Sequence, residues 1–250
     1  MKNFDLNKNE YNQKDSSKSI IELFNYDKDM SSLLFNSIKD IESTFGYKIL
    51  YFINRKINDL TLEQNEYEKI FFAIFDKNNS NKLIEILCNR FNMQMNHKYI
   101  ISWIQSNLLT FGEWLKIFKH LNKELQYLII GSYKGINWNI RQFLIIFKEL
   151  NLLRNMCAHN KTIFNLKINL LDYNVNFISD FILKNDLKMK IKNKKLKLFD
   201  MVLIIEKISN RNISINLKLI FTKKIVKKII ESEFISNVAK DFILKIIGIE

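Results

Sequence analysis

The sequence predicts an all-α fold, a helical bundle followed by a C-terminal helical extension. The chain of 250 residues has no proline and only 5 glycines, so few residues interrupt helices. Leucine, isoleucine, lysine and glutamate are abundant and support long helices once one face is buried. Apolar residues also recur at helical spacing along most of the chain. The hydrophobic fraction of 47% provides for one large core or two closely packed halves.

The N-terminal part of the chain is expected to hold a polar arm and several helices. The arm is rich in Asn, Lys, Asp and Ser and is predicted to be mobile or a fraying helix. In chain order, the expected elements are the arm at 1–19, a long helix capped by Asp29 and closed by a turn at Asn58 or Asp59, a helix through Phe75 after a capping box of Thr61 and Gln64, a loop at 78–81, and helices over 82–91 and 98–109.

The remainder is expected to continue as helices separated by short turns. Residues 110–114 break the helical pattern, which resumes at Leu115, and residues 131–135 form the clearest turn. The later expected elements are a long helix from Trp138 to about Ala158 capped by Asn137, a basic tract at 184–197 that forms a short strand pair or a loop, and helices over 199–208, 217–230 and 234–247. We therefore predict one helical domain over 20–250, with 166–250 as its C-terminal extension.

The charge of the chain points to a polyanionic partner. Its net charge is +13 and its pI is about 9.5, which most simply indicates nucleic acid. Genome composition is the competing explanation, because nearly all the cations are lysine and because asparagine and isoleucine are also abundant. This pattern is typical of an AT-rich genome, so both explanations stay open.

Cysteine and histidine usage predicts neither a disulfide nor a cofactor. The 2 cysteines, Cys88 and Cys157, are far apart in apolar helical contexts and are expected to be reduced. Cys157 has no base at nucleophile spacing and is expected to be a small buried packing residue. With no CxxC motif and 3 scattered histidines, we expect no zinc or other metal site. The polar N-terminus lacks a secretion signal, and no apolar run approaches the roughly 18 residues of a membrane span. We expect a soluble cytoplasmic protein.

The candidate catalytic residues are Arg154, Asn155 and His159, at the end of the long central helix. Arginine can clamp a phosphate and histidine can move a proton near neutral pH, and cutting RNA requires both. Asn155 and His159 share a helix face, whereas Arg154 and His159 are about 140° apart on an ideal helix. Either Arg154 reaches round, or the helix distorts, or a dimer builds a composite site. A purely structural alternative has Arg154 at the helix-terminal carbonyls and His159 on a carbonyl partner.

The segment from Arg154 to Asn165 reads RNMCAHNKTIFN. It resembles the R-N-x-C-A-H-H-x-R-L-W-N pattern of the Abi family of bacterial abortive-infection proteins, of the AbiD/AbiF type, within the HEPN superfamily. Upstream, 110–121 is similar to the family's Phe-Gly segment and 40–42 to its early helix ending in glutamate. The resemblance is expected to cover residues 21–250. Three positions depart from the pattern, where this chain has Asn160, Thr162 and Phe164 for the family's His, Arg and Trp.

The resemblance implies a HEPN-type bundle with metal-independent endoribonuclease activity, serving as an effector in phage defence or in a toxin-like system. In such enzymes two copies of the motif meet at a homodimer cleft. The ribose 2′-hydroxyl attacks the adjacent phosphate and leaves a 2′,3′-cyclic phosphate. By this resemblance His159 is the general acid or base, Arg154 stabilises phosphoryl charge, and Asn155 orients the histidine or a phosphate oxygen. The departures remove possible secondary RNA contacts but leave Arg154 and His159 in place.

RNA contacts are expected from two regions. Beside the motif the candidates are Asn160, Lys161 and Asn165. In the basic tract, lysine alternates with apolar residues, and the candidates are Lys188, Lys190, Lys192, Lys194, Lys195 and Lys197. A solvated linker is the competing interpretation of the tract.

Two other functions remain open from sequence. One is a non-catalytic RNA-binding protein of the same fold that holds a structured noncoding RNA. The other is a basic protein acting at a membrane surface, which is disfavoured because no lysine-rich helix carries a wide apolar opposite face.

Replacing the six tract lysines with glutamine tests whether they contact RNA. If each contacts a phosphate, each adds roughly one unit to the slope of log affinity against log salt. The six-fold variant should then show a flatter slope and weaker binding to all RNA sequences alike, measured by fluorescence anisotropy across a salt series. An unchanged slope would identify the tract as a solvated linker.

Overall fold

The structure of this protein is a computed structural model. It describes residues 13–60, 66–77, 83–85, 100, 104, 109–164, 166, 168–169, 195–209, 226–233, 235 and 237–247. The helices are α1 (Gln13–Asp59), α2 (Tyr67–Ile74), α5 (Phe111–His120), α6 (Lys123–Gly131), α7 (Ile140–Ala158), α9 (Leu198–Ile208), α11 (Lys227–Glu231) and α12 (Asn237–Ile247). The predicted all-α fold is confirmed. In the described part of the chain, the only sheet is an antiparallel pair, β1 (Ile168–Asn169) with β2 (Lys195–Leu196), in which Ile168 lies opposite Leu196.

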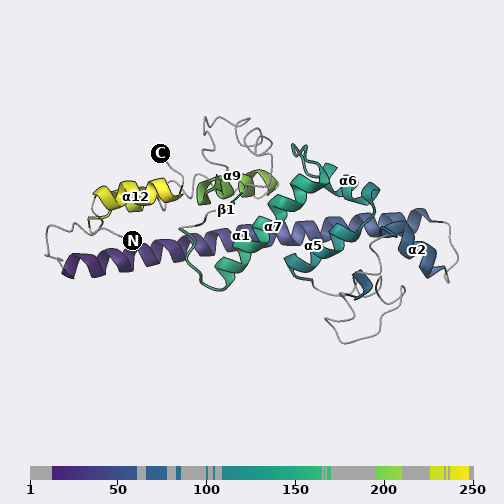
Figure 1. The fold of residues 1–250 in the computed structure, drawn as a ribbon, viewed down its shortest axis with the longest axis horizontal. Coiled ribbons are helices and arrows are strands. Elements are labelled where there is room, and N and C mark those ends of the chain that lie inside the picture. The colour runs from purple at the N-terminus through teal and green to yellow at the C-terminus, as the bar shows by residue number, and fades with distance from the viewer. Residues whose placement is uncertain are drawn as a thin grey trace.

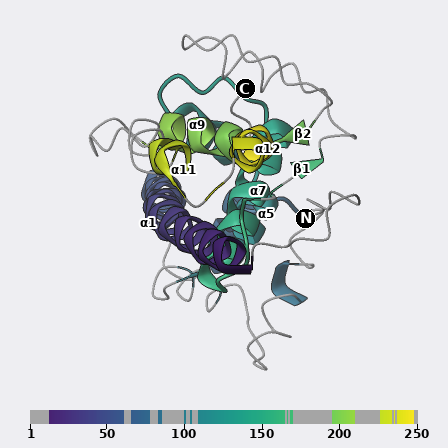
Figure 2. The same cartoon turned by 90° about the vertical axis from the view of Figure 1, so that its left-hand side faces the viewer.

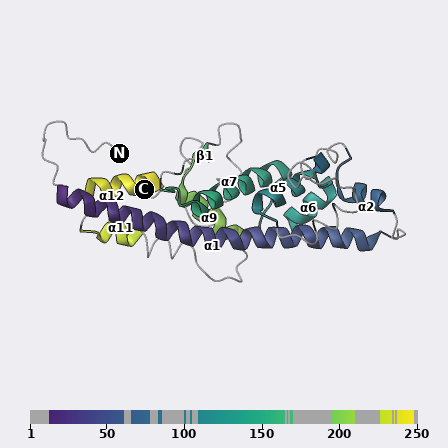
Figure 3. The ribbon, with the colours of Figure 1, turned by 90° about the horizontal axis from the view of Figure 1, so that it is seen from below.

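The molecule is elongated along α1, the first and longest helix. Its 47 residues extend about 70 Å at 1.5 Å per residue. Figure 1 shows α1 running nearly the full length of the molecule. Seen from below, the other helices lie along it, with α11 and α12 towards its N-terminal end and α2 at its C-terminal end (Figure 3). The end-on view in Figure 2 shows α9 and α12 forming a separate layer above α1.

The beginning of α1 differs from the prediction. The helix starts at Gln13, so the expected arm at 1–19 already contains helix, and Asp29 lies inside the helix rather than at its N-cap. The N-terminal turns of α1 contact α11 and the residues that follow it. The Tyr26 hydroxyl donates to the Lys228 carbonyl at 3.4 Å, Ser232 donates to the Glu22 carboxylate, and Asp29 pairs with Lys228 at 3.9 Å. These contacts hold α1 against a distant segment from Glu22 onward.

The other boundaries agree with the sequence in part. The closing turns near Asp59 and 131–135, the end of α7 at Ala158 and helix α9 are confirmed. Asn139, not Asn137, caps α7, because its side chain accepts from the Gln142 N–H while Gln142 bonds back to the Asn139 N–H, each at 2.9 Å. The expected break at 110–114 is instead the start of α5, where the Glu113 carboxylate accepts from both Thr110 donors.

Several predictions fall largely or wholly outside the described residues. These are the arm at 1–12, the Thr61–Gln64 capping box, the loop at 78–81, and most of the helices over 82–91, 98–109 and 217–230. Within the last region, α11 is present over its final residues, and α12 begins at Asn237 rather than at 234. No helix in the described ranges is both long enough and apolar enough to cross a membrane.

A cluster of phenylalanines forms the centre of the core where α1, α5 and α7 meet. Phe45 of α1 lies 4.9 Å from Phe147 and 5.8 Å from Phe143 of α7, measured between ring centroids. It also lies 6.1 Å from Phe111 and 5.6 Å from Phe118 of α5. All five rings are fully buried. Burying one such ring stabilises the fold by about 2–3 kcal/mol, so this cluster fixes α7, and with it the candidate motif, against α1.

Two glycine substitutions test how closely α1 and α5 approach. A Cβ atom at Gly46 would lie 2.7 Å from the buried indole of Trp114, whereas a Cβ at Gly131 would meet nothing within 4 Å. Gly46→Ala should therefore lower the free energy of unfolding by about 1–3 kcal/mol, although alanine favours helices. Gly131→Ala should change it by less than about 1 kcal/mol, in the stabilising direction. Urea denaturation of both variants measures the difference, and equal effects would contradict the close packing.

Candidate functional site

The C-terminal end of α7 forms a closed helix cap directly after the candidate motif. The Lys161 N–H donates to the Met156 carbonyl at 2.9 Å and the Asn160 N–H donates to the Cys157 carbonyl at 3.2 Å. These two bonds define a Schellman motif, and Asn160 has the left-handed φ of 51° that this motif requires. Asparagine and histidine both tolerate this conformation better than most residues. Asn160 therefore replaces the family's histidine without straining the turn.

Arg154 is held by groups on α1. Its Nε donates to Glu42 Oε2 at 3.3 Å, and its guanidinium carbon lies 5.5 Å from the centre of the Phe35 ring. Its Nη1 donates to Asn155 Oδ1 at 3.4 Å. The side chains of Arg154 and Glu42 are 25% and 11% exposed, so the pair is largely removed from water. The alternative in which Arg154 binds the helix-terminal carbonyls is not what the structure shows.

The Glu42 carboxylate links three helices. Its Oε2 accepts from Arg154 on α7, and its Oε1 accepts from the Phe111 backbone N–H at the start of α5, at 2.5 Å. Because this N–H belongs to the first turn of α5, it has no partner within its own helix. The sequence singled out all three segments for their resemblance to one family. The sequence did not reveal that one carboxylate joins these segments. The signal that could have found it is Glu42 itself, the glutamate that ends the 40–42 segment of the resemblance.

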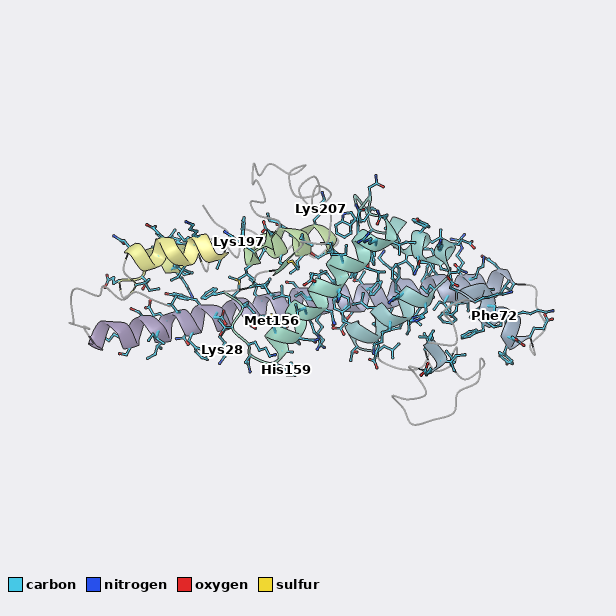
Figure 4. The ribbon with its side chains drawn as sticks, viewed as in Figure 1. Lys28, Phe72, Met156, His159, Lys197 and Lys207 are labelled. Carbon is cyan, nitrogen blue, oxygen red and sulfur yellow. The ribbon has the colours of Figure 1, made fainter. Side chains whose placement is uncertain are left out.

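His159 is exposed at the C-cap of α7. Figure 4 shows it at the end of the helix, at the edge of the molecule. Its backbone N–H continues the helix by donating to the Asn155 carbonyl at 3.1 Å. Among the described residues, no hydrogen bond or ion pair joins its ring to Arg154 or Asn155. The structure thus brings Arg154 and Asn155 together and leaves the imidazole exposed, and no carbonyl group of the described residues binds it as the structural alternative requires.

The loop after His159 is tethered to α1 by Asp27. One oxygen of this carboxylate, Oδ1, accepts from the backbone N–H groups of Ile163 and Phe164, at 3.0 and 2.9 Å. Burial raises the pKa of the Asp27 carboxyl, and the two backbone hydrogen bonds act in the opposite direction. Ile163 is fully buried, so the chain returns to the core four residues after His159. Asp27 was not identified from sequence, because nothing local marks a side chain that binds a loop 136 residues away.

Cys157, between the motif residues, is a buried free thiol. Burial raises the pKa of this thiol, and Ser31 lies within hydrogen-bonding contact. A thiol with a raised pKa is a poor nucleophile, which agrees with the prediction of a packing residue. His120 is also buried, and its Nδ1 lies 2.7 Å from the Lys116 carbonyl, as expected of a structural histidine.

The expected RNA-binding residues are not gathered in one place. Asn160 and Lys161 are exposed beside His159, whereas Asn165 lies outside the described residues, as do Lys188, Lys190, Lys192 and Lys194. Lys195 is in β2, and Lys197 precedes α9, where its Nζ donates to the Lys245 carbonyl at 2.7 Å. Figure 4 shows Lys197 well separated from His159. In the described part of the molecule, no three His, Cys, Asp or Glu side chains gather to hold a metal ion.

Comparison with known protein families yields a match over the first two thirds of the chain. The family model described as Abi-like protein matches residues 1–165, which is more than half of the chain. This span starts earlier than the expected 21–250 and leaves 166–250 outside the match. No curated protein and no solved structure matches the chain.

Substituting Glu42 tests its central position. Glu42→Ala removes the acceptor of both contacts and leaves Arg154 without its anion, so the free energy of unfolding should fall by about 3 kcal/mol. Glu42→Gln keeps an oxygen for the Phe111 N–H and should lower it by about 1 kcal/mol. Urea denaturation measures both. The matched control is Glu124→Ala, which breaks the exposed pair with Lys56 and should cost less than about 1 kcal/mol.

Proposed function

The chain belongs to the Abi-like protein family, and from that premise we propose that it is a metal-independent endoribonuclease of the HEPN type, acting as an RNA-cleaving effector. Family membership associates the chain with abortive infection or phage defence. The observation that carries the proposal is the geometry at the end of α7. Arg154 is fixed by Glu42 and lies against Asn155, while His159 is exposed to solvent one turn further on.

In the proposed reaction, the ribose 2′-oxygen attacks the adjacent phosphorus and the bond to the 5′-oxygen breaks. The 2′-proton passes to a general base, and a general acid protonates the departing 5′-oxygen. The products are a 2′,3′-cyclic phosphate and a 5′-hydroxyl. His159 fits proton transfer because its ring is accessible to a substrate. Arg154 uses two of its five N–H donors on Glu42 and Asn155, so the remaining donors can stabilise charge on the phosphoryl oxygens.

Two copies of the chain would complete this site. Base and acid are both needed in one turnover, and each copy supplies one His159. Arg154 faces α1, whereas His159 lies beyond the last helical residue of α7, so a composite site removes the need for both to reach one phosphate from the same copy. Leu152 is 49% exposed beside the motif, and a second copy would cover it. We therefore propose a homodimer whose two-fold axis passes near His159.

Substitution of His159 tests the proposed reaction. His159→Ala should slow RNA cleavage by about 100-fold or more, while RNA affinity and unfolding free energy stay nearly unchanged, because the ring is exposed and proton transfer is not needed for binding. Arg154→Ala should abolish cleavage, weaken binding modestly and also destabilise the fold through Glu42. Cleavage is measured on labelled RNA in the presence of EDTA, with end-group analysis for the cyclic phosphate.

Controls separate chemistry from structure. Lys134→Ala changes an exposed turn residue outside the motif and should cleave at the parent rate. Added imidazole should partly restore cleavage by His159→Ala, because the exposed site admits a small proton carrier. If the parent binds RNA but releases no cyclic phosphate, the non-catalytic RNA-binding function is correct. If light scattering shows that the protein is a monomer and this monomer cleaves RNA at the full rate, the composite site is refuted.

A further inference from the structure

A surface groove of about 590 Å³ lies where α5, α6 and α7 meet, away from the motif at the end of α7. Figures 1 and 3 show these three helices side by side. The floor of the groove is aliphatic and is formed by Leu121, Ile140, Leu144 and Ile145. This volume falls in the range of small-molecule sites. The rim of the groove, however, is more polar than its floor.

The rim of the groove is strongly basic. Lys119, Lys123, Arg141 and Lys148 line it, with Asp76 as the one carboxylate among the lining residues. All four cationic residues are exposed. The groove also receives the first turns of α6, at Lys123, and of α7, at Ile140, and the dipoles of these two helices add positive partial charge there. An anionic, extended ligand with some apolar surface fits this combination.

The groove opens on the face of α7 that carries Asn155 and His159, not on the face where Arg154 contacts α1. Residues seven apart on a helix are rotated by only about 20°, and residues eighteen apart coincide. Arg141, Lys148 and Asn155 are each seven apart, and His159 is eighteen residues after Arg141, so the four form one line along α7. All four residues are exposed. Along this line Lys148 is about 16 Å from His159 at 1.5 Å per residue.

We propose that this groove binds the RNA strand on one side of the scissile phosphate. The inference rests on the function proposed above and adds a substrate-binding site to it. The phosphates would contact Lys119, Lys123 and Lys148, while ribose and base edges lie on the aliphatic floor. A stacked strand rises about 3.4 Å per nucleotide, so the groove holds nucleotides about five positions from the bond that His159 acts on. The floor has no aromatic ring for base stacking among its lining residues, so the groove should bind RNA without sequence preference.

Continuity with the motif favours RNA over a protein occupant. A basic groove alone would also accept an acidic peptide. Here two of the four cations, Arg141 and Lys148, lie on the same line of α7 as Asn155 and His159, at a distance that a short single strand spans. Lys197, in contrast, precedes α9 and lies away from His159 (Figure 4). The groove, rather than Lys197, is therefore expected to hold substrate close to the reacting bond.

The test compares two triple variants in the His159→Ala background, which binds RNA without cutting it. The groove variant is Lys119→Gln, Lys123→Gln, Lys148→Gln. The control variant is Lys39→Gln, Lys227→Gln, Lys245→Gln, which removes the same charge from exposed positions on α1, α11 and α12. Binding of a fluorescent, unstructured 20-nucleotide RNA is measured across a salt series. The groove variant should bind at least about tenfold more weakly near 0.1 M salt, and its salt slope should fall by about 2 units, since each single-strand phosphate contact contributes about 0.7.

The outcomes distinguish this inference from the proposed function. The control variant should lose less than about threefold in affinity, because its charges lie away from the helix line. With His159 restored, the groove variant should raise KM and leave kcat nearly unchanged. If both variants bind alike while the parent still cleaves RNA, only the groove proposal is wrong. If the groove variant instead changes the oligomeric mass with RNA affinity unchanged, the face contacts a second copy. A parent that binds no RNA overturns both proposals.

Discussion

The architecture around the candidate site depends on the buried carboxylate of Glu42. It joins α1 to α5 through the Phe111 N–H and to α7 through Arg154, over sequence separations of 69 and 112 residues. A carboxylate this far from water is stable only while both partners are present. The phenylalanine cluster around Phe45 supplies most of the apolar stabilisation, but it is non-directional. Glu42 adds the directional constraint that sets how far along α1 the other two helices lie.

The same interaction prepares Arg154 for chemistry. An exposed arginine explores many rotamers, and ordering it on a phosphate costs conformational entropy. Contacts with Glu42, Phe35 and Asn155 already restrict this side chain before any ligand binds. The guanidinium thus serves the fold and, in the proposed function, the reaction. Loss of Arg154 therefore cannot separate these roles by itself, whereas loss of the exposed His159 can.

The sequence predicted what local patterns encode. The helical class, the end of α7, the turn at 131–135 and the packing role of Cys157 follow from spacing, glycine and apolar context. The N-cap of α7 was predicted at Asn137, whereas the structure has it at Asn139. Two asparagines precede the same apolar run, and only tertiary geometry determines which of them caps the helix. The sequence also placed an N-cap at Asp29, which lies inside α1 because the helix already begins at Gln13. Pairs such as Glu42 with Arg154 join distant segments, and helical periodicity carries no information about them.

The position of the charges says more than their sum. A surplus of +13 is equally compatible with RNA binding and with an AT-rich genome, because lysine count alone does not tell a binding surface from a solvated one. Genome composition scatters lysines over every exposed face. Genome composition does not select positions, so it does not explain why Arg141 and Lys148 lie on the helix line that ends in Asn155 and His159. Nor does it explain why these two cations lie beside an aliphatic floor. The alignment of these cations with the motif therefore supports RNA binding in a way that the net charge cannot.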